Sequence, residues 1–303
     1  RNKTLKTKKM KSQVKEARTA WAMLAPALVV LGVIQAYPIL RTFWLSFHEM
    51  NLKRPQTGFP WIGLENYAKI LSDSRAGEDI MFTLKFTIAT VALELIIGFA
   101  AALIMNRAFK GRGLVRAAIL VPWAIPTSVS AMMWKFIYND QYGMFNDILY
   151  RLGIIDGYKA WLSTRSGSFM AMVITDVWKT APYMALLLLA GLQVIDEGLY
   201  EAAKIDGANV FQRFFKITLP IVKPSLLVAL LFRTLDAFRV FDLVSVLTGG
   251  ANGTESIAMY AYKQLMTFLN FGYGSALAIL IFIIVFGISL IYMCFLKKDL
   301  TAE

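Results

Sequence analysis

Four charged residues recur at every third position of one apolar segment: Arg233, Asp236, Arg239 and Asp242. On a helix, side chains three residues apart are neighbours, so each charge would lie beside an opposite one. Charged groups inside a bilayer face the interior of a helix bundle or water. Counted from Pro220, Arg233 and Asp236 lie roughly 20 to 24 Å along such a helix, a depth that suits a solute cavity. The alternative is that these pairs only hold the helix to its neighbours or to a partner subunit.

Other apolar segments also contain charges. Glu94 stands near the middle of one segment and needs a partner that the spacing does not name, and another segment contains Asp176 and Lys179. Lys85 and Lys135 lie near segment ends, where a long side chain can reach the membrane interface. These positions predict a polar interior within a membrane-embedded bundle.

Several kinds of chemistry are excluded by what the sequence lacks. No Gly-x-x-x-x-Gly-Lys-Ser/Thr motif is present, so the chain has no such loop to hold ATP phosphates. One His and one cysteine, Cys294, provide neither a thiolate metal site nor an internal disulfide. The sequence therefore predicts a protein that is not an enzyme, binds no cofactor itself and takes any ATP-derived energy from a partner.

The composition places these charges in a membrane protein. Hydrophobic residues make up 57% of the 303 positions and charged residues 17%, which is too apolar for an ordinary soluble domain. A bilayer core of ~30 Å needs roughly 20 apolar residues in a helix. Six segments qualify, and they predict an all-α polytopic fold: residues 21–47, 80–105, 114–138, 167–192, 220–247 and 272–296.

The net charge of +12 is unevenly distributed among the loops. Lys and Arg gather in residues 1–20, after the second segment, in residues 193–219 and after the last segment. By the positive-inside rule, both termini and the loop 193–219 are expected in the cytoplasm. Residues 1–20 then form a basic tail that can contact anionic lipid, not nucleic acid, and residues 21–303 form one transmembrane domain.

The loop 193–219 has local signals for two short helices. Asp196 can cap a first helix, Gly207 can end it in the left-handed conformation, and Asn209 can cap a second helix. Such a pair of helices at the membrane face is either a simple connector or a docking surface for another protein.

The order of residues in this loop resembles a known motif. Glu201-Ala202-Ala203, then Gly207 and residues 217–220 (Ile-Thr-Leu-Pro), are similar to the motif of binding-protein-dependent ABC importer permeases. In that family the loop docks into a cleft of the ATPase subunit. The resemblance implies a coupling role for Glu201, Ala202, Ala203, Asp206 and Gly207.

The resemblance extends along the chain to the maltose- and trehalose-type sugar permeases. It is carried by residues 37–38, 63–67, 178–183, 233–242 and 247–250. The family places sugar contacts on the fourth and fifth helices, here at Thr180, Tyr183, Arg233, Asp236, Ala237 and Val240. Arg and Asp replace smaller polar and aromatic residues of the family there. The additional N-terminal helices and inserted outer domain of the maltose prototype are absent, so no separate outer module is expected.

The resemblance implies the permease subunit of an ATP-driven importer that takes up a disaccharide such as trehalose or maltose by alternating access. Its implied partners are a second related permease, two ATPase subunits that bind ATP and Mg²⁺, an extracytoplasmic solute-binding protein, membrane lipid and the sugar. The expected location is the inner membrane of a bacterial or archaeal cell. The alternative is an ion-coupled secondary carrier for a small polar solute, with Glu94, Asp176 and Asp236 as titrating groups.

Overall fold

The computed structural model describes the backbone of residues 2–300 and the side chains of residues 17–297 except that of Thr57. Regular structure in this part of the chain is helical, and strand-like pairing is limited to the isolated bridges of His48 with Trp61 and Asn51 with Asn270. The predicted all-α class is confirmed.

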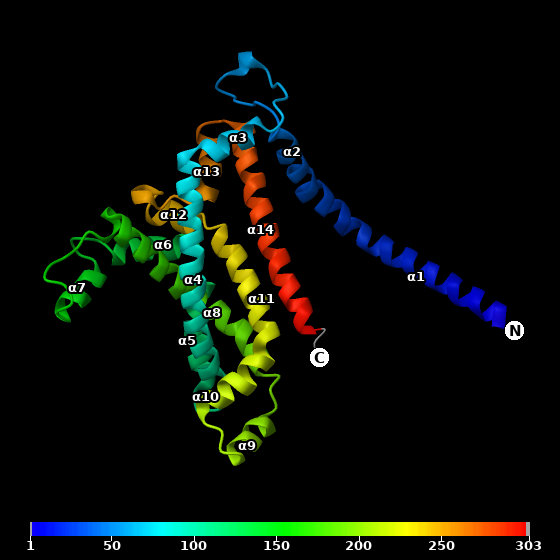
Figure 1. Cartoon of the computed structure of the whole chain (residues 1–303), viewed down its shortest axis with the longest axis vertical. Coiled ribbons are helices and arrows are strands. Elements are labelled where there is room, and N and C mark those ends of the chain that lie inside the picture. The colour runs from blue at the N-terminus through cyan, green and yellow to red at the C-terminus, as the bar shows by residue number, and fades with distance from the viewer. Residues whose placement is uncertain (1, 301–303) are drawn as a thin grey trace.

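Five helices of the described chain are long and apolar enough to cross a membrane, and a bent helix pair would make a sixth. The first of the five begins in α1 (Asn2–Leu31) and continues through a π-helical turn (Gly32–Ala36) into α2 (Tyr37–Leu45). The others contain α4 (Ser74–Asn106), α8 (Arg165–Leu192), α11 (Leu219–Phe238) and α14 (Phe271–Leu300). In Figure 1, α4, α8, α11 and α14 form an upright bundle, and α1 leans away from it.

The predicted continuous span 114–138 is wrong, because the structure divides it into α5 (Arg112–Ala124) and α6 (Thr127–Ile137), bent by 94°. Ile125, the residue before Pro126, is extended, with φ −77° and ψ 134°. A proline ring disfavours the helical conformation of the preceding residue and supplies no N–H for the helical ladder. The break therefore follows from Pro126, and it directs α6 away from the bundle axis (Figure 1).

The predicted span 220–247 is also wrong in its last third. Helix α11 ends at Phe238, and α12 (Asp242–Leu247) follows after a non-helical Phe241 with φ −134° and ψ −58°. The hydroxyl of Ser256 donates to the carbonyl of Val240 at 2.6 Å, which satisfies the backbone at the break. Arg239 therefore closes α11, Asp242 opens a separate helix, and the predicted four-residue series of charges is not continuous.

The bundle packs most closely where α4 meets α8. A Cβ on Gly98 of α4 would lie 2.8 Å from Cγ of Met184 and 3.1 Å from the carbonyl oxygen of Ala181, both in α8. Glycine is thus required for this approach of the two backbones. Buried apolar side chains of α4, α8 and α11 fill the space around it.

Short helices cover the two ends of the bundle. At one end lie α3 (Glu65–Ser72) and α13 (Ile257–Tyr262), and at the other lie α9 (Glu197–Ile205) and α10 (Val210–Arg213) (Figure 1). Helix α7 (Met144–Arg151) lies on the side arm with α6. Single turns complete the chain: 3₁₀ turns at Pro55–Thr57, Trp161–Ser163 and Ala251–Gly253, and π turns at Phe214–Thr218 and Lys263–Thr267.

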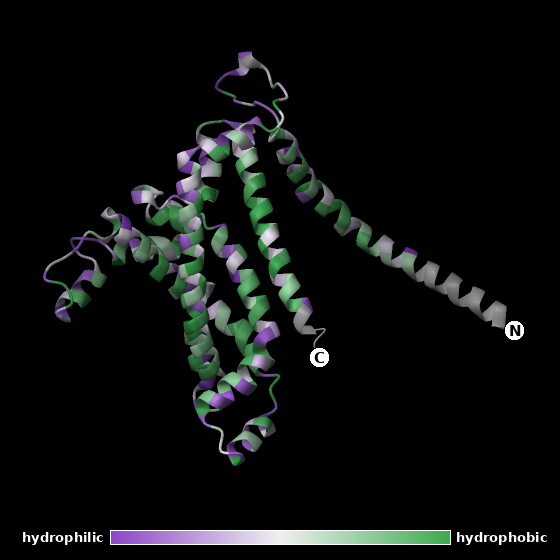
Figure 2. Cartoon of the chain, viewed as in Figure 1, coloured by the Kyte–Doolittle hydropathy of each residue, from purple (hydrophilic) through white to green (hydrophobic). Residues whose placement is uncertain are grey.

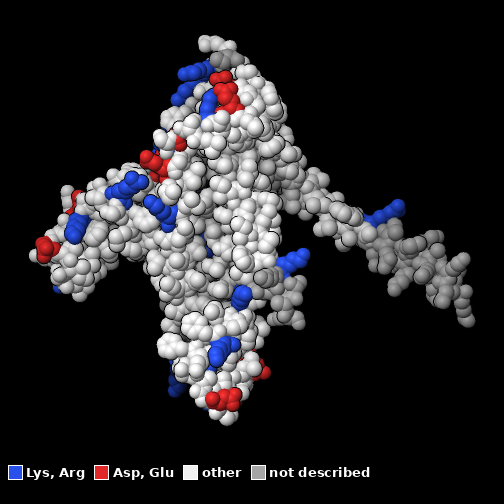
Figure 3. Space-filling view, in the orientation of Figure 1, with Lys and Arg blue, Asp and Glu red and all other residues white. Residues whose placement is uncertain are grey.

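Polarity follows this arrangement. Hydrophobic residues dominate the middle of the long helices, and hydrophilic residues gather toward the ends (Figure 2). On the face shown in Figure 3, most Lys, Arg, Asp and Glu lie at the two ends and on the side arm, leaving a largely uncharged band between them. This band is the part of the bundle suited to contact with lipid chains.

Candidate functional site

The loop 193–219 folds as its local signals predict. The Asp196 side chain accepts a hydrogen bond from the Gly198 N–H at 2.8 Å and caps α9. Gly207 has φ +79°, a left-handed conformation that glycine adopts without a steric penalty. Asn209 and Gln212 form a reciprocal capping box at the start of α10, with two hydrogen bonds of 2.9 Å. The two short helices are therefore defined by residues of the loop itself.

Helix α9 is held to the bundle on one side and open on the other. The hydroxyl groups of Tyr200 and Thr218 lie 2.8 Å apart, which joins α9 to the π turn that precedes α11. Among the predicted coupling residues, only Ala203 is half-buried, and the others are exposed: Glu201, Ala202, Asp206 and Gly207. In the described part of the chain, the Glu201 carboxylate has no hydrogen-bond or ion-pair partner. The arrangement presents a small, fixed and unpaired polar surface.

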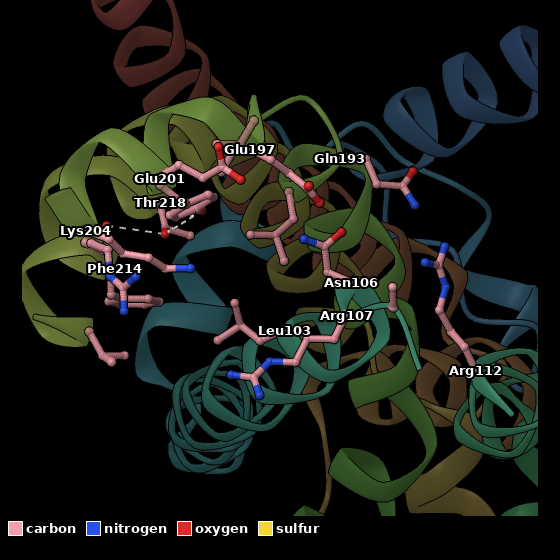
Figure 4. Close-up of a pocket in the computed structure, with 16 residues that line it drawn as sticks. Leu103, Asn106, Arg107, Arg112, Gln193, Glu197, Glu201, Lys204, Phe214 and Thr218 are labelled. Carbon is pink, nitrogen blue, oxygen red and sulfur yellow. Dashed lines mark hydrogen bonds between the residues drawn. The ribbon is translucent and has the colours of Figure 1, made fainter. Parts of the chain in front are cut away.

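A cavity of about 900 Å³ lies between α9 and the loop that joins α4 to α5. Figure 4 shows Glu201 and Lys204 of α9 on one side of it, and Arg107 of the α4–α5 loop with Arg112 at the start of α5 on the other. Thr218 lines it between α9 and the bundle. The composition of this cavity was not anticipated from the sequence, because its walls come from segments about 100 residues apart.

Arg233 of α11 is the centre of a buried charge cluster within the bundle. Its guanidinium is 1% exposed and donates to both carboxylate oxygens of Glu94 in α4, to Asp176 of α8 at 2.8 Å, and to Asp236 at 2.7 Å. The Thr180 hydroxyl lies 2.6 Å from Glu94 Oε1 and 2.5 Å from the Asp176 carbonyl. These five residues are called the Arg233 cluster below.

The Arg233 cluster joins three helices that are far apart in sequence. Glu94 and Arg233 are separated by 139 positions, so the partner that Glu94 required could not be named from local spacing. Removing an ion from water costs several kcal/mol, and only good geometry with further hydrogen bonds offsets this. Four hydrogen bonds from one guanidinium provide that geometry. Arg233 therefore pairs α11 with α4 and α8 through Glu94 and Asp176, and its role as a sugar contact stays a prediction.

The six predicted sugar-contact residues differ in their access to solvent. Arg233 and Ala237 are buried, at 1% and 2% exposure, and Thr180 is buried at 8% with its hydroxyl already engaged. Val240 lies beyond the end of α11 and is half-buried. The Asp236 side chain, by contrast, is 70% exposed.

Tyr183, the remaining predicted contact, is half-buried and stacks on Trp123 of α5 with ring centroids 5.5 Å apart. Sequence reasoning missed Trp123, because its partner Tyr183 lies 60 positions later in the chain. Lys179 of α8 is also buried, at 9% exposure. The role of each of these residues in solute recognition stays a prediction.

Lys85 and Lys135, the lysines expected near the membrane interface, differ in their contacts. Lys85 is exposed on α4. Lys135 is exposed as well, but its ammonium group donates to the carbonyl of Val246 at 3.2 Å, which ties α6 to α12. This bond helps to position α6 beyond the bend.

Comparison with known proteins agrees with this geometry. Residues 94–296 match the family described as binding-protein-dependent transport system inner membrane component. The chain is 46% identical over 285 residues to a trehalose/maltose transport system permease protein, MalF, of Thermococcus litoralis, covering 93% of this chain and 95% of that protein. It is 42% identical over 283 residues to a trehalose transport system permease protein, SugA, of Mycobacterium tuberculosis, covering 93% and 90%.

A solved structure shares the fold. A chain of a bacterial ABC transporter involved in import of the acidic polysaccharide alginate superimposes with a TM-score of 0.81 at 21% identity, covering 96% of this chain and 99% of the other. The resemblance carried by the loop 193–219 is confirmed, and so is the multi-pass membrane architecture. The chain belongs to the family of inner membrane components of binding-protein-dependent transport systems.

Proposed function

We propose that this chain is the permease subunit of an ATP-driven ABC importer that takes up a disaccharide such as trehalose or maltose by alternating access. The observation that carries the proposal is the 46% identity, over nearly the full length of both chains, to a permease named for trehalose and maltose transport. Two separate surfaces also support the proposal. The open face of α9 suits coupling to an ATPase, and the polar groups around Asp236 suit contact with the solute.

The coupling surface consists of Glu201, Ala202, Ala203, Asp206 and Gly207. An ATPase subunit, which binds the ATP and Mg²⁺, docks on this face of α9. The small side chains of Ala202 and Ala203 allow close approach, and the unpaired carboxylate of Glu201 offers a strong acceptor. A second related permease and a second ATPase complete the complex. Both termini and α9 lie in the cytoplasm, and the solute-binding protein delivers sugar at the opposite end.

Fewer side chains are available to contact the solute than the family resemblance alone implies. A sugar hydroxyl removed from water needs a hydrogen-bond partner, and the exposed carboxylate of Asp236 is available as an acceptor. Arg233 orients that carboxylate at 2.7 Å, while Tyr183 stacked on Trp123 offers an aromatic face. Thr180, Arg233, Ala237 and Val240 shape this surface from behind or from its edge.

The ion-coupled carrier requires carboxylates that are free to take up a cation. Glu94 and Asp176 are both hydrogen-bonded to Arg233, which leaves only Asp236 exposed among the three. The geometry therefore favours the ATP-driven importer over the carrier.

The coupling proposal is tested by co-purification with the ATPase subunit. Glu201→Lys and Gly207→Pro should abolish co-purification and uptake while the chain still inserts into the membrane. Asp156→Lys, which changes an exposed carboxylate in the loop after α7, is the matched control and should retain both. Normal co-purification of the ATPase with either α9 variant would contradict the docking role.

The solute proposal is tested by an uptake screen over disaccharides with the reconstituted complex and its solute-binding protein. Asp236→Asn should reduce uptake at least tenfold with assembly intact, whereas Asp242→Asn, also an exposed carboxylate but outside the Arg233 cluster, should not. Equal uptake by both variants would show that Asp236 stabilises the helix bundle and does not contact the solute.

A further inference from the structure

The cavity beside α9 adjoins a second hollow on the surface of α4. The second hollow has a volume of about 710 Å³ and shares Leu103, Arg107 and Ala108 with the cavity. Its other lining residues are Ala100, Ile104 and Phe109. The two hollows therefore adjoin across the three residues that they share, and they are called the polar end and the apolar end of the site below.

The polar end has an excess of unpaired positive charge. It is lined by four cations and two carboxylates: Arg107, Arg112, Lys204 and Arg213, with Glu197 and Glu201. Within the described residues, none of the four cationic side chains has a hydrogen bond or ion pair. The planar N–H groups of arginine match the oxygens of a phosphate group. Unpaired arginines in a concave site therefore favour a phosphate-bearing ligand.

The apolar end lies on the membrane-spanning helix itself. Leu103 and Ile104 are 36% and 52% exposed on the last turns of α4, and Phe109 is 41% exposed just beyond it. Arg107 directly follows Asn106, the last residue of the apolar span. Cationic side chains immediately after a span lie at the level of lipid headgroups, so the two ends of the site match the two parts of a phospholipid in depth as well as in polarity.

We propose that an anionic phospholipid binds here, with its headgroup among the cations of the cavity and one acyl chain along Leu103 and Ile104. Clusters of basic residues beside a transmembrane helix attract anionic lipid with about 1 kcal/mol per cation. The apolar groove favours a lipid over a small soluble phosphate. Because the cavity also contains Glu201 and Lys204, the lipid would lie directly behind the surface of α9 proposed for coupling.

The test is lipid binding by the purified full-length chain in detergent, measured by native mass spectrometry. Phosphatidylglycerol is titrated against phosphatidylcholine with the same acyl chains. Arg107→Gln with Arg112→Gln should weaken phosphatidylglycerol binding about 30-fold, and each single change about fivefold. The matched control is Lys110→Gln, an exposed cation of the same loop that lines neither hollow, and it should change binding less than twofold.

A second variant tests the apolar end. Ala108→Trp places a bulky ring where the two hollows meet, and it should also weaken phosphatidylglycerol binding while all four cations remain. Unchanged phosphatidylglycerol affinity in both Ala108→Trp and the single arginine variants would overturn the proposal. So would equal binding of the two lipids by the wild-type chain.

Two further measurements distinguish a lipid from other ligands of this cavity. Inorganic phosphate that displaces phosphatidylglycerol at millimolar concentration would show a small-anion site instead of a lipid site. If the arginine variants lose ATPase co-purification but bind phosphatidylglycerol normally, the cavity is a protein-docking surface. Either result would overturn the lipid proposal, and neither would affect the transport function proposed above.

Discussion

Replacing Arg233 with methionine tests whether the Arg233 cluster holds α4, α8 and α11 together. Methionine fills part of the same volume but carries no charge and donates no hydrogen bond. Glu94, at 0% exposure, and Asp176, at 10%, would then lose their cation without gaining access to water. Removing one partner of a buried ion pair costs about 3–5 kcal/mol. We therefore expect Arg233→Met to be strongly destabilising.

The assay is thermal unfolding of the purified full-length chain in detergent. At about 2 °C per kcal/mol for a chain of this size, the midpoint should fall by roughly 6–10 °C. Arg239→Met is the matched control, because Arg239 is exposed at the end of α11 and, among the described residues, its side chain donates only to the Leu235 carbonyl. Its midpoint should stay within about 1 °C of the unmodified chain, as for most surface substitutions.

A second change distinguishes lost charge balance from lost packing. Adding Glu94→Gln to Arg233→Met removes one of the two stranded buried carboxylates, so the double variant should unfold at a higher temperature than Arg233→Met alone. A coupling energy of about 1 kcal/mol or more is expected for residues in direct contact. A midpoint for Arg233→Met equal to that of the unmodified chain, or strictly additive effects, would refute the reasoning.

Two further predictions concern packing and pH. Gly98→Ala should destabilise the chain by roughly 1–3 kcal/mol in the same unfolding assay, because the added Cβ would lie 2.8 Å from a side-chain carbon of α8. The control is Gly287→Ala in α14, which should be neutral because no atom lies within 4 Å of its added Cβ. Burial raises the pKa of Asp73 at the start of α4, but hydrogen bonds from Tyr273 and Tyr260 outweigh it, and the net pKa lies below 3.8. The stability that Asp73 contributes is therefore complete above pH 3.8 and lost as the pH falls through the lowered pKa, and Asp73→Asn should remove this acid-dependent loss from unfolding scans.

The features that were predictable from the sequence are those determined by neighbouring residues. Asp196, Gly207 and Asn209 act on backbone groups within three positions, and the structure places each of them as predicted. The apolar spans are equally local, because a bilayer requires a continuous run of apolar residues. The ion pair of Arg233 with Asp236 also follows from i, i+3 spacing.

The helix breaks were not predictable from residue type alone. Pro122, Pro182 and Pro224 lie inside helices, whereas Pro126 follows a bend of 94°. Residue type alone therefore does not tell which proline ends a helix. The break after Phe238 depends on Ser256, whose hydroxyl satisfies the freed Val240 carbonyl from a later segment. Such compensation depends on tertiary structure.

The position of the Arg233 cluster constrains how motion of α9 can spread through the bundle. Helix α8 leads into the loop 193–219 and α11 follows it, so any displacement of α9 acts on both helices. Arg233 joins these two helices to each other and to α4 by buried ion pairs, and separating them would strand charges at a cost of several kcal/mol.

We therefore expect α4, α8 and α11 to move as one rigid body. Helices α5 and α6 have no residue in the Arg233 cluster and meet at the bend beside Pro126. They contact α8 partly through the stacked rings of Trp123 and Tyr183, and an aromatic stack can slide without leaving a charge unpaired. Relative movement during transport is thus expected at the interface of α5 with α8. Crosslinking α5 to α8 there should stop uptake, whereas crosslinking α4 to α8 should not.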